Sequence, residues 1–135
     1  MKIENENIEH ILKLMNKSQL TLEGARAVSE LNLYEFAVNR LYYSCFYLVS
    51  ALLLLDGLTV KTHAGAIAKF SELYVKSGLL SRNHSITLNI LFQNRQTADY
   101  DVEAEVSLEK YEELLAKTEE FVRDVEGLIL SELES

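Results

Sequence analysis

Three short groups of residues hold the side chains that could do chemistry. They are Arg40 with Tyr43, Lys61 with Thr62 and His63, and Arg95 with Asp99 and Tyr100. Each group places a cation close to a hydroxyl, an imidazole or a carboxyl group, and such combinations bind phosphate or transfer protons. The sequence has no Gly-rich phosphate loop and no nucleophile elbow. Any phosphate chemistry must therefore use one of these local groups.

The Lys61 group stands at the expected start of a helix, with Thr62 as the candidate N-cap. Free backbone N–H groups and the helix dipole favour an anion at such a position, and the Thr62 hydroxyl and Lys61 would add to this. An imidazole near the positive end of the dipole tends to stay neutral, which suits a general base. Two interpretations stay open: a phosphate site, or a histidine that only helps to close a turn.

Arg40 and Arg95 fall on apolar stretches, so their charges need partners. A buried guanidinium without a carboxylate or other acceptors is very costly. For Arg40 we favour an ion pair with Asp99 that joins two helices, and the same pairing could orient Arg95. The alternative is a direct catalytic role for these residues.

Charge and composition narrow the function classes. The chain of 135 residues has a net charge of −8, the wrong sign for wrapping a nucleic-acid backbone over a wide face. His10, His63 and His84 lack the spacing of metal ligands, and no second cysteine is present, so we predict no metal and no cofactor. A phosphate site must be local.

The one cysteine and the apolar segments indicate a cytoplasmic protein. Cys45 cannot form an internal disulfide and is expected to be a small core residue. The first ten residues do not resemble a secretory signal. The run 41–55 is shorter than the roughly 20 residues that span a bilayer, and Arg40 and Asp56 bracket it. We expect no membrane partner.

The elements that must position these groups are helices. The longest apolar stretch, 33–56, is predicted to be a central helix that is apolar on every side and is therefore covered all round by other helices or by a second copy. Further helices are predicted at 4–30, with a kink near Gly24, and at 63–76, 81–97 and from 107 onward, with an acidic loop at 98–107. We expect an all-α, up-and-down bundle of four to five helices, forming one domain over 1–135 with residues 1–15 as an extension.

The order of three segments resembles one family. YEFAVNRLYYSCFYLVSALLL is followed by KTHAGAIAKF and then by ILFQNRQTADYD, between two amphipathic helices, over residues 16–121. In the order and spacing of these segments, the chain resembles the compact single-domain prokaryotic branch of the HEPN (higher eukaryotes and prokaryotes nucleotide-binding) superfamily. The resemblance implies a helical bundle that commonly forms homodimers and is often encoded beside a minimal nucleotidyltransferase in toxin and antitoxin pairs.

Active members of this family are metal-independent ribonucleases, and the resemblance carries over only part of their signature. That signature is an Arg followed, after four to six residues, by His. Arg95 matches the Arg, but the three permitted positions hold Tyr100, Asp101 and Val102. A phenol with a pKa near 10 is a poor substitute for imidazole at neutral pH. Either His63 supplies the proton transfer beside Arg95, or Tyr100 is a site to which a partner nucleotidyltransferase attaches a nucleotide.

The preferred interpretation is a cytoplasmic homodimer that binds nucleotide or RNA phosphate and works with a nucleotidyltransferase, with metal-independent RNase activity left open. The predicted site residues are Arg95, His63 and Tyr100 for catalysis and Arg40, Lys61, Thr62 and Asp99 for phosphate or nucleotide binding. The alternative is a non-catalytic dimerisation or interaction module whose charged residues are structural. If Lys61, His63 and Arg95 converge in an open pocket, phosphate binding is favoured.

Overall fold

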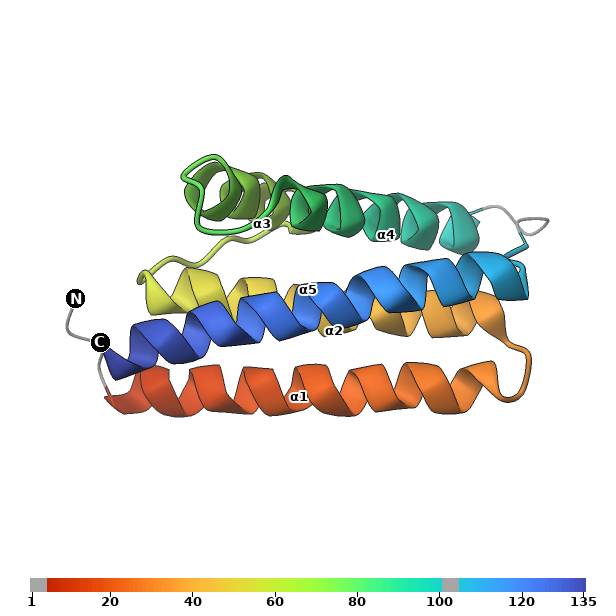
Figure 1. The fold of residues 1–135 in the computed structure, drawn as a ribbon, viewed down its shortest axis with the longest axis horizontal. Coiled ribbons are helices and arrows are strands. Elements are labelled where there is room, and N and C mark those ends of the chain that lie inside the picture. The colour runs from red at the N-terminus through yellow and green to blue at the C-terminus, as the bar shows by residue number, and fades with distance from the viewer. Residues whose placement is uncertain (1–4, 101–104) are drawn as a thin grey trace.

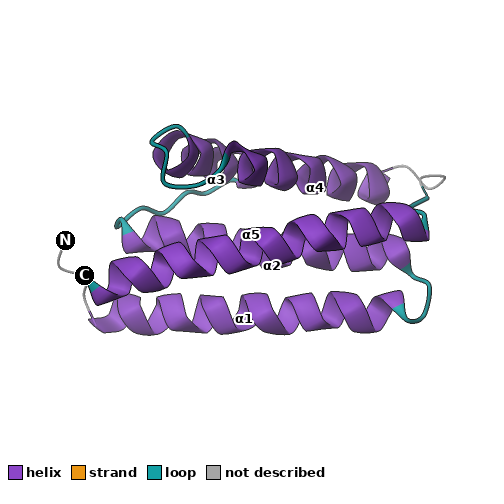
Figure 2. Cartoon of the chain, viewed as in Figure 1, coloured by secondary structure: helices purple, strands orange, loops and turns teal. Residues whose placement is uncertain are grey.

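The chain folds into a bundle of long helices (Figures 1 and 2). A computed structural model describes the backbone of residues 5–100 and 105–135 and the side chains of 6–95 and 105–135. Within these ranges the elements are α1 (Asn5–Ser29), α2 (Tyr34–Leu55), α3 (His63–Phe70), the π-helical turn η1 (Ser71–Val75), α4 (Arg82–Tyr100) and α5 (Leu108–Glu134). The predicted all-α bundle is confirmed.

Helix α2 lies at the centre of the bundle and contacts α1, α3, α4 and α5. Figure 1 shows α1 antiparallel to α2 along one side, α5 beside both, and the α3–α4 pair across the opposite side. Helix α1 runs without interruption through Gly24. The sequence groups that could do chemistry are thus carried by α2, the start of α3 and the end of α4, which are neighbours in space.

Within one copy of the chain, other helices cover α2 on all sides except one stripe. Most of its apolar residues are fully buried, but Phe36 is 63% exposed. Arg40, Tyr43 and Tyr47 are only half-buried and follow Phe36 at helical spacing. We call these four residues the open face of α2. Lys17 of α1 lies over Tyr47, and Arg95 of α4 and His63 of α3 lie against Tyr43, so Phe36 is the most open part of this face.

Among the described helices, α2 alone is long and apolar enough to cross a membrane by length and composition. In its most apolar stretch of 18 residues, 61% of the stretch is buried inside the bundle, as in the core helix of a soluble protein. Cys45 on this helix is completely buried. Cys45 is therefore a core residue, as predicted, and burial raises the pKa of its thiol.

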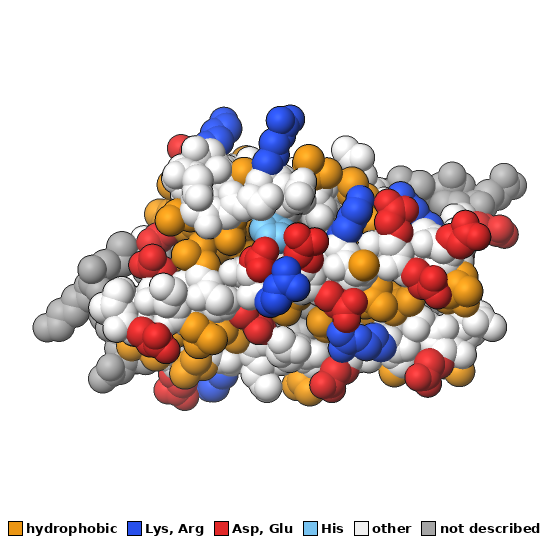
Figure 3. Space-filling model, viewed as in Figure 1, with side chains coloured by type: hydrophobic (Ala, Val, Ile, Leu, Met, Phe, Trp, Pro, Cys, Tyr) orange, Lys and Arg blue, Asp and Glu red, His pale blue; other side chains and the backbone are white. Residues whose placement is uncertain are grey.

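The helix ends follow local sequence signals. Ser107 caps α5, with its hydroxyl accepting from the Lys110 N–H at 3.1 Å. After α2, Gly57 has φ of 73° and the Leu58 N–H donates to the Leu53 carbonyl at 2.7 Å, which is a Schellman-type stop. The acidic residues of α5 are exposed and form its solvated face; they are Glu109, Glu112, Glu113, Glu119 and Glu120. Figure 3 shows carboxylates spread over this side of the molecule.

Two boundaries differ from the sequence prediction. The helix expected at 63–76 ends as a π-helical turn, in which Tyr74 is anchored to α2 by hydrogen bonds of 2.9 Å to the Leu52 carbonyl and 2.5 Å to Asp56. Helix α4 continues to Tyr100, so the loop expected to begin at 98 starts later. The loss of apolar periodicity there does not stop a helix, because the segment has neither Gly nor Pro.

A buried histidine links α4 to α5 and should make the fold sensitive to acid. His84 is 1% exposed and its Nε2 lies 2.8 Å from Asp124 Oδ2. The hydrogen bond to His84 lowers the pKa of the Asp124 carboxyl below its usual value. A lowered carboxyl pKa stabilises the fold above the unfolded value of about 3.9, and this contribution is lost as pH falls through the folded value.

We therefore expect Asp124→Asn to lower the melting temperature at pH 7 and to flatten its decline between about pH 5 and pH 2. Thermal melts across this pH range test the prediction. Glu120→Gln, an exposed change one turn earlier on α5, is the matched control and should follow the wild-type curve. An Asp124→Asn curve parallel to wild type at all pH values would contradict the assignment.

Candidate phosphate-binding site

The start of α3 places His63 against an aromatic cluster on α2. The imidazole stacks on the Phe46 ring with centroids 4.1 Å apart and planes 8° apart. Its Nδ1 lies 2.6 Å from the Tyr42 hydroxyl, and the Tyr43 ring meets it edge-on at 6.1 Å. His63 is therefore held in a fixed orientation by three rings of one helix, although part of it stays in contact with solvent.

Two guanidinium groups lie over the same rings. Arg95 of α4 has its Cζ 5.6 Å from the Tyr42 ring centroid and 5.5 Å from that of Tyr43. Arg40 of α2 has its Cζ 4.9 Å from the Tyr43 centroid. Cations over aromatic faces are attracted by the ring quadrupole. Arg40 and Arg95 thus share Tyr43, and Arg95 and His63 share both Tyr42 and Tyr43.

The electrostatics of the cluster favour a neutral imidazole. Burial, followed by the charge of Arg95, lowers the pKa of His63. The sequence predicts a neutral imidazole from the helix dipole, and burial and the guanidinium act in the same direction. Burial also raises the pKa of the Tyr42 phenol, which keeps its proton. Either this phenol donates to Nδ1, leaving an outward Nε2–H donor, or Nδ1–H donates to the phenol oxygen, leaving Nε2 free to accept a proton.

Arg95 has an unused donor at this site. Its Nε is shielded from solvent and has no hydrogen-bond partner among the described residues. A buried N–H without a partner is costly, and an anionic oxygen is the partner that a guanidinium binds most strongly. Arg95 is only half-buried, so its guanidinium can meet an anion beside the oriented imidazole.

The structure brings together Arg40, His63 and Arg95 from the predicted site. Thr62 is the N-cap of α3, because its hydroxyl accepts from the Gly65 N–H at 3.0 Å. Lys61 is exposed just before α3, and its side chain makes no ion pair with a described residue. Helices α2, α3 and α4 thus supply the site, and Thr62 caps α3 beside it.

The predicted partner of Arg40 is Asp99, and the side chains of Asp99 and Tyr100 lie outside the described residues. Within the described part, Arg40 donates to Asn39 on its own helix at 2.9 Å. It is half-buried, so the solvent relieves part of its need for a carboxylate. The ion pair with Asp99 stays a prediction.

Sequence reasoning missed Tyr42 and Phe46. Both were part of an apolar run and looked like core residues, and Tyr42 is indeed fully buried. Their spacing of four residues was the available signal, because it places two rings one above the other on the helix, 5.8 Å apart, where a side chain from another helix can stack. No group of three or more His, Cys, Asp or Glu gathers as metal ligands would in the part of the chain that the structure describes.

A small apolar cavity adjoins the cluster and shares Phe46 with it. Its volume is about 290 Å³. It lies between α1, α2 and the segment before α3, and its lining residues are His10, Leu14, Phe46, Ser50, Leu53, Leu54, Leu58, Thr59, Val60 and Ala66. Phe46 therefore borders both the aromatic cluster and this cavity.

Comparison with known proteins identifies the family. The sequence model of the HEPN domain matches residues 11–128. A Methanocaldococcus jannaschii protein named "Putative toxin MJ0142" is 35% identical over 119 residues, covering 88% of this chain and 81% of the relative. A Thermotoga maritima "UPF0332 protein" is 34% identical over 125 residues, covering 93% and 95%. A second M. jannaschii protein, "Putative toxin MJ0605", is 32% identical over 114 residues, 84% of each chain. The chain belongs to the HEPN domain family.

The N-cap of α3, next to His63, can be tested by substitutions at Thr62. Thr62→Ala removes the side-chain acceptor of the Gly65 N–H and should cost about 1 kcal/mol of folding free energy. Chemical denaturation measures this loss. Thr62→Ser keeps the acceptor and should stay within about 0.5 kcal/mol of wild type. Equal losses in both variants would show that the hydroxyl does not cap the helix.

Proposed function

We propose that the cluster of Arg40, His63 and Arg95 binds the phosphate of a single-stranded RNA or nucleotide, and that the chain is a toxin-like, metal-independent ribonuclease. One observation carries the proposal. The half-buried Arg95 guanidinium, whose Nε has no hydrogen-bond partner among the described residues, lies on the same two rings as an oriented imidazole whose pKa is lowered. This pairing supplies phosphate binding and proton transfer side by side, which RNA cleavage without a metal requires.

In the proposed reaction, Arg95 holds the non-bridging phosphate oxygens with two N–H donors and Arg40 adds positive charge. His63 Nε2 takes the proton of the 2′-hydroxyl, in the tautomer in which Nδ1–H donates to Tyr42. The 2′-oxygen bonds to phosphorus, and the bond from phosphorus to the 5′-oxygen breaks. A proton from the imidazolium or from water goes to that 5′-oxygen. The products are a 2′,3′-cyclic phosphate and a 5′-hydroxyl.

The cavity beside Phe46 supports a nucleic-acid substrate over inorganic phosphate. Sequence-tolerant binding of single strands commonly uses aromatic side chains and apolar slots for unstacked bases, with cations along the backbone. Phe46 joins an apolar cavity to the cationic cluster. The net charge of −8 argues against a long electrostatic footprint. We infer a short contact of one or two nucleotides at an unpaired site.

The relatives named as toxins support an inhibitory partner. We infer that this partner is a minimal nucleotidyltransferase and that both act in the cytoplasm. Modification of Tyr100 by nucleotide transfer would be one form of inhibition. Mass spectrometry of the chain after co-expression with such a partner tests this, and an unmodified Tyr100 in an inhibited preparation would contradict it.

The open face of α2 supports a homodimer, in which the exposed Phe36 would be covered by the second copy. We expect Phe36→Asp to raise the dimer dissociation constant at least about 30-fold, since central aromatic residues often carry 2 kcal/mol or more at interfaces. Analytical ultracentrifugation measures this. Leu79→Asp, an exposed apolar position before α4, is the control and should leave association unchanged. A monomeric wild type at all concentrations would refute the dimer.

The activity itself is tested with the purified chain and an unstructured RNA in EDTA. We expect cleavage that EDTA does not suppress and products that end in a 2′,3′-cyclic phosphate, identified by mass spectrometry. Cleavage that requires Mg²⁺, or products with a 3′-hydroxyl and a 5′-phosphate, would contradict the proposed chemistry.

A further inference from the structure

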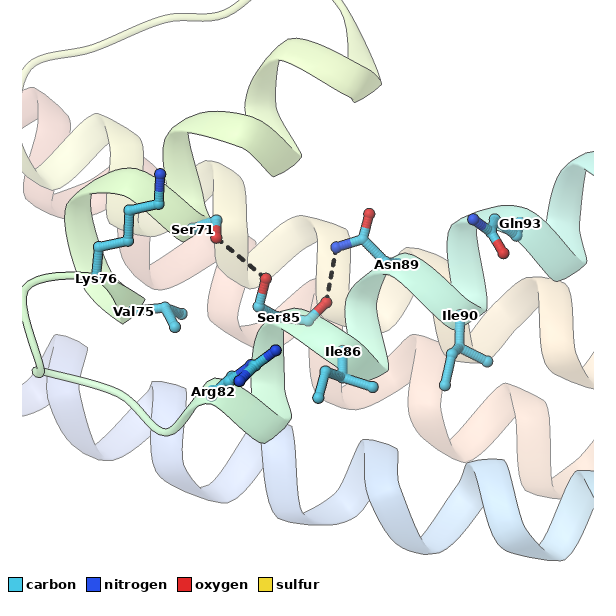
Figure 4. A pocket seen from close by; sticks show the side chains of 9 residues that line it. All are labelled: Ser71, Val75, Lys76, Arg82, Ser85, Ile86, Asn89, Ile90 and Gln93. Atoms are coloured by element: carbon cyan, nitrogen blue, oxygen red, sulfur yellow. Dashed lines mark hydrogen bonds between the residues drawn. The ribbon is translucent and has the colours of Figure 1, made fainter.

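A second concave surface lies between η1 and α4, away from the aromatic cluster. It is a groove of about 590 Å³ lined by Ser71, Val75, Lys76, Arg82, Ser85, Ile86, Asn89, Ile90 and Gln93. Figure 4 shows these side chains along one stretch of α4 and the facing turn of η1. The volume falls in the range of small-molecule sites. None of the lining residues belongs to the cluster around His63.

One end of the groove is cationic in an otherwise acidic molecule. Lys76 and Arg82 line it, and none of the nine lining residues carries a carboxylate. The other lysines and arginines of the described chain include several that are paired with Glu or Asp, such as Lys69 with Glu72 on the outside of the same helical segment. Lys76 and Arg82 form no such pair within the described residues. An anionic ligand would find two uncompensated charges there.

Hydroxyl and amide groups follow along the groove. Ser85 donates to the Ser71 hydroxyl at 3.2 Å, the one side-chain hydrogen bond that joins η1 to α4 among the described residues (Figure 4). The Ser71 proton stays available to an acceptor. Asn89 donates to the Ser85 carbonyl at 2.8 Å, which fixes its amide and leaves its oxygen free. Gln93 adds a second amide one turn further on.

The remaining lining is aliphatic. Val75, Ile86 and Ile90 form this part, and Ile86 is 45% exposed. Ile86 and Ile90 project from the same side of α4 in Figure 4. An apolar surface next to cations and amides matches a ligand with a flat or apolar body, polar edges and a charged end.

We propose that this groove binds a small organic phosphate of about the size of a nucleoside monophosphate. Lys76 and Arg82 hold the phosphate, Val75, Ile86 and Ile90 contact the flat body, and Asn89 and Gln93 bind its polar edge. The site is separate from the RNA site and does not require that the chain cleave RNA.

The position of the groove gives such binding a consequence for the rest of the molecule. A smaller cavity of about 180 Å³ shares Ser71 and Asn89 with it and continues to Ala64 and Phe92. Ala64 follows His63 directly, and Phe92 packs on Tyr42 with centroids 5.7 Å apart. A ligand that contacts both η1 and α4 would therefore link the α3–η1 segment, which begins with His63, to α4, which carries Arg95.

The test is an NMR titration of the ¹⁵N-labelled chain with AMP, and in parallel with GMP, adenosine, ribose 5-phosphate and inorganic phosphate. We expect saturable shifts at the amides of Ser71, Ser85 and Asn89, with AMP or GMP binding at least tenfold tighter than the other three probes. The same titration of the His63→Ala, Arg95→Ala double variant should give the same shifts, which separates this groove from the RNA site.

Charge reversal provides the matched comparison. Lys76→Glu with Arg82→Glu should weaken nucleotide binding at least tenfold, whereas Lys69→Glu with Lys117→Glu, the same charge change elsewhere, should not. RNA cleavage by the Lys76, Arg82 variant should be unchanged in the absence of nucleotide. Shifts confined to residues around Tyr42, equal binding by both charge variants, equal binding of ribose 5-phosphate and AMP, or no groove shifts at millimolar nucleotide would each overturn the proposal.

Discussion

Replacing Arg95 with alanine is expected to reduce RNA cleavage at least about 100-fold and to weaken RNA binding. Removing one preorganised donor to a developing charge typically costs 10² to 10³ in rate. Arg95 is expected to matter more than Arg40, because its Nε has no partner among the described residues whereas Arg40 already donates to Asn39. Single-turnover cleavage and binding to a 2′-deoxy analogue measure the two effects separately.

Two companion variants sharpen this result. Arg95→Lys keeps the charge but loses the planar fork, so we expect binding to recover more than cleavage. Arg123→Ala, at an exposed arginine on α5, should leave both unchanged. Thermal melts of all three variants check that the fold is intact. Full cleavage by a folded Arg95→Ala variant would exclude Arg95 from the site.

The His63→Ala variant should lose about 10²- to 10⁴-fold in cleavage rate, the usual share of a general base, while it still binds RNA. Added imidazole should restore part of the rate, which a purely structural histidine would not allow. The wild-type rate should fall at acid pH, where His63 becomes protonated. Because Arg95 and burial lower the pKa of His63, this fall should occur below the ordinary histidine value of about 6.5.

Tyr42→Phe separates positioning from proton transfer. The phenol orients Nδ1 at 2.6 Å, so its loss should lower the maximal rate about tenfold while the RNA dissociation constant stays near that of wild type. Imidazole should not rescue this variant, because His63 is still present.

A His63→Ala variant with the wild-type rate and pH profile would show that another group moves the proton.

The sequence predicted the helices well because their signals are local. The apolar run of α2, the Thr62 and Ser107 caps and the Gly57 stop depend on neighbouring residues, and the structure contains each of them. The π-helical turn at Ser71–Val75 was not predicted, because the register there is set by Tyr74 bonding to α2. Its cause lies in a contact across the bundle, which periodicity does not report.

The candidate site was predictable only in part for the same reason. Arg95 and His63 stood out as charged or titratable residues in apolar helices. Both residues contact Tyr42. These contacts could not be predicted from sequence spacing, because they form only when α2, α3 and α4 are packed together. Phe36 shows a different limit of the sequence. An apolar residue on a central helix predicts burial, yet it is exposed on the open face.

The central claim is that Arg95 and His63 form one phosphate-binding site, and side-chain NMR tests it most directly. A short 2′-deoxy oligonucleotide, which cannot be cleaved, is titrated while the His63 Cε1–H and Arg95 Nε–H signals are followed. Both signals should shift together with one dissociation constant, and Arg95→Ala should abolish the His63 shift. Saturable binding that leaves both signals unmoved, or no binding at all, would contradict the account.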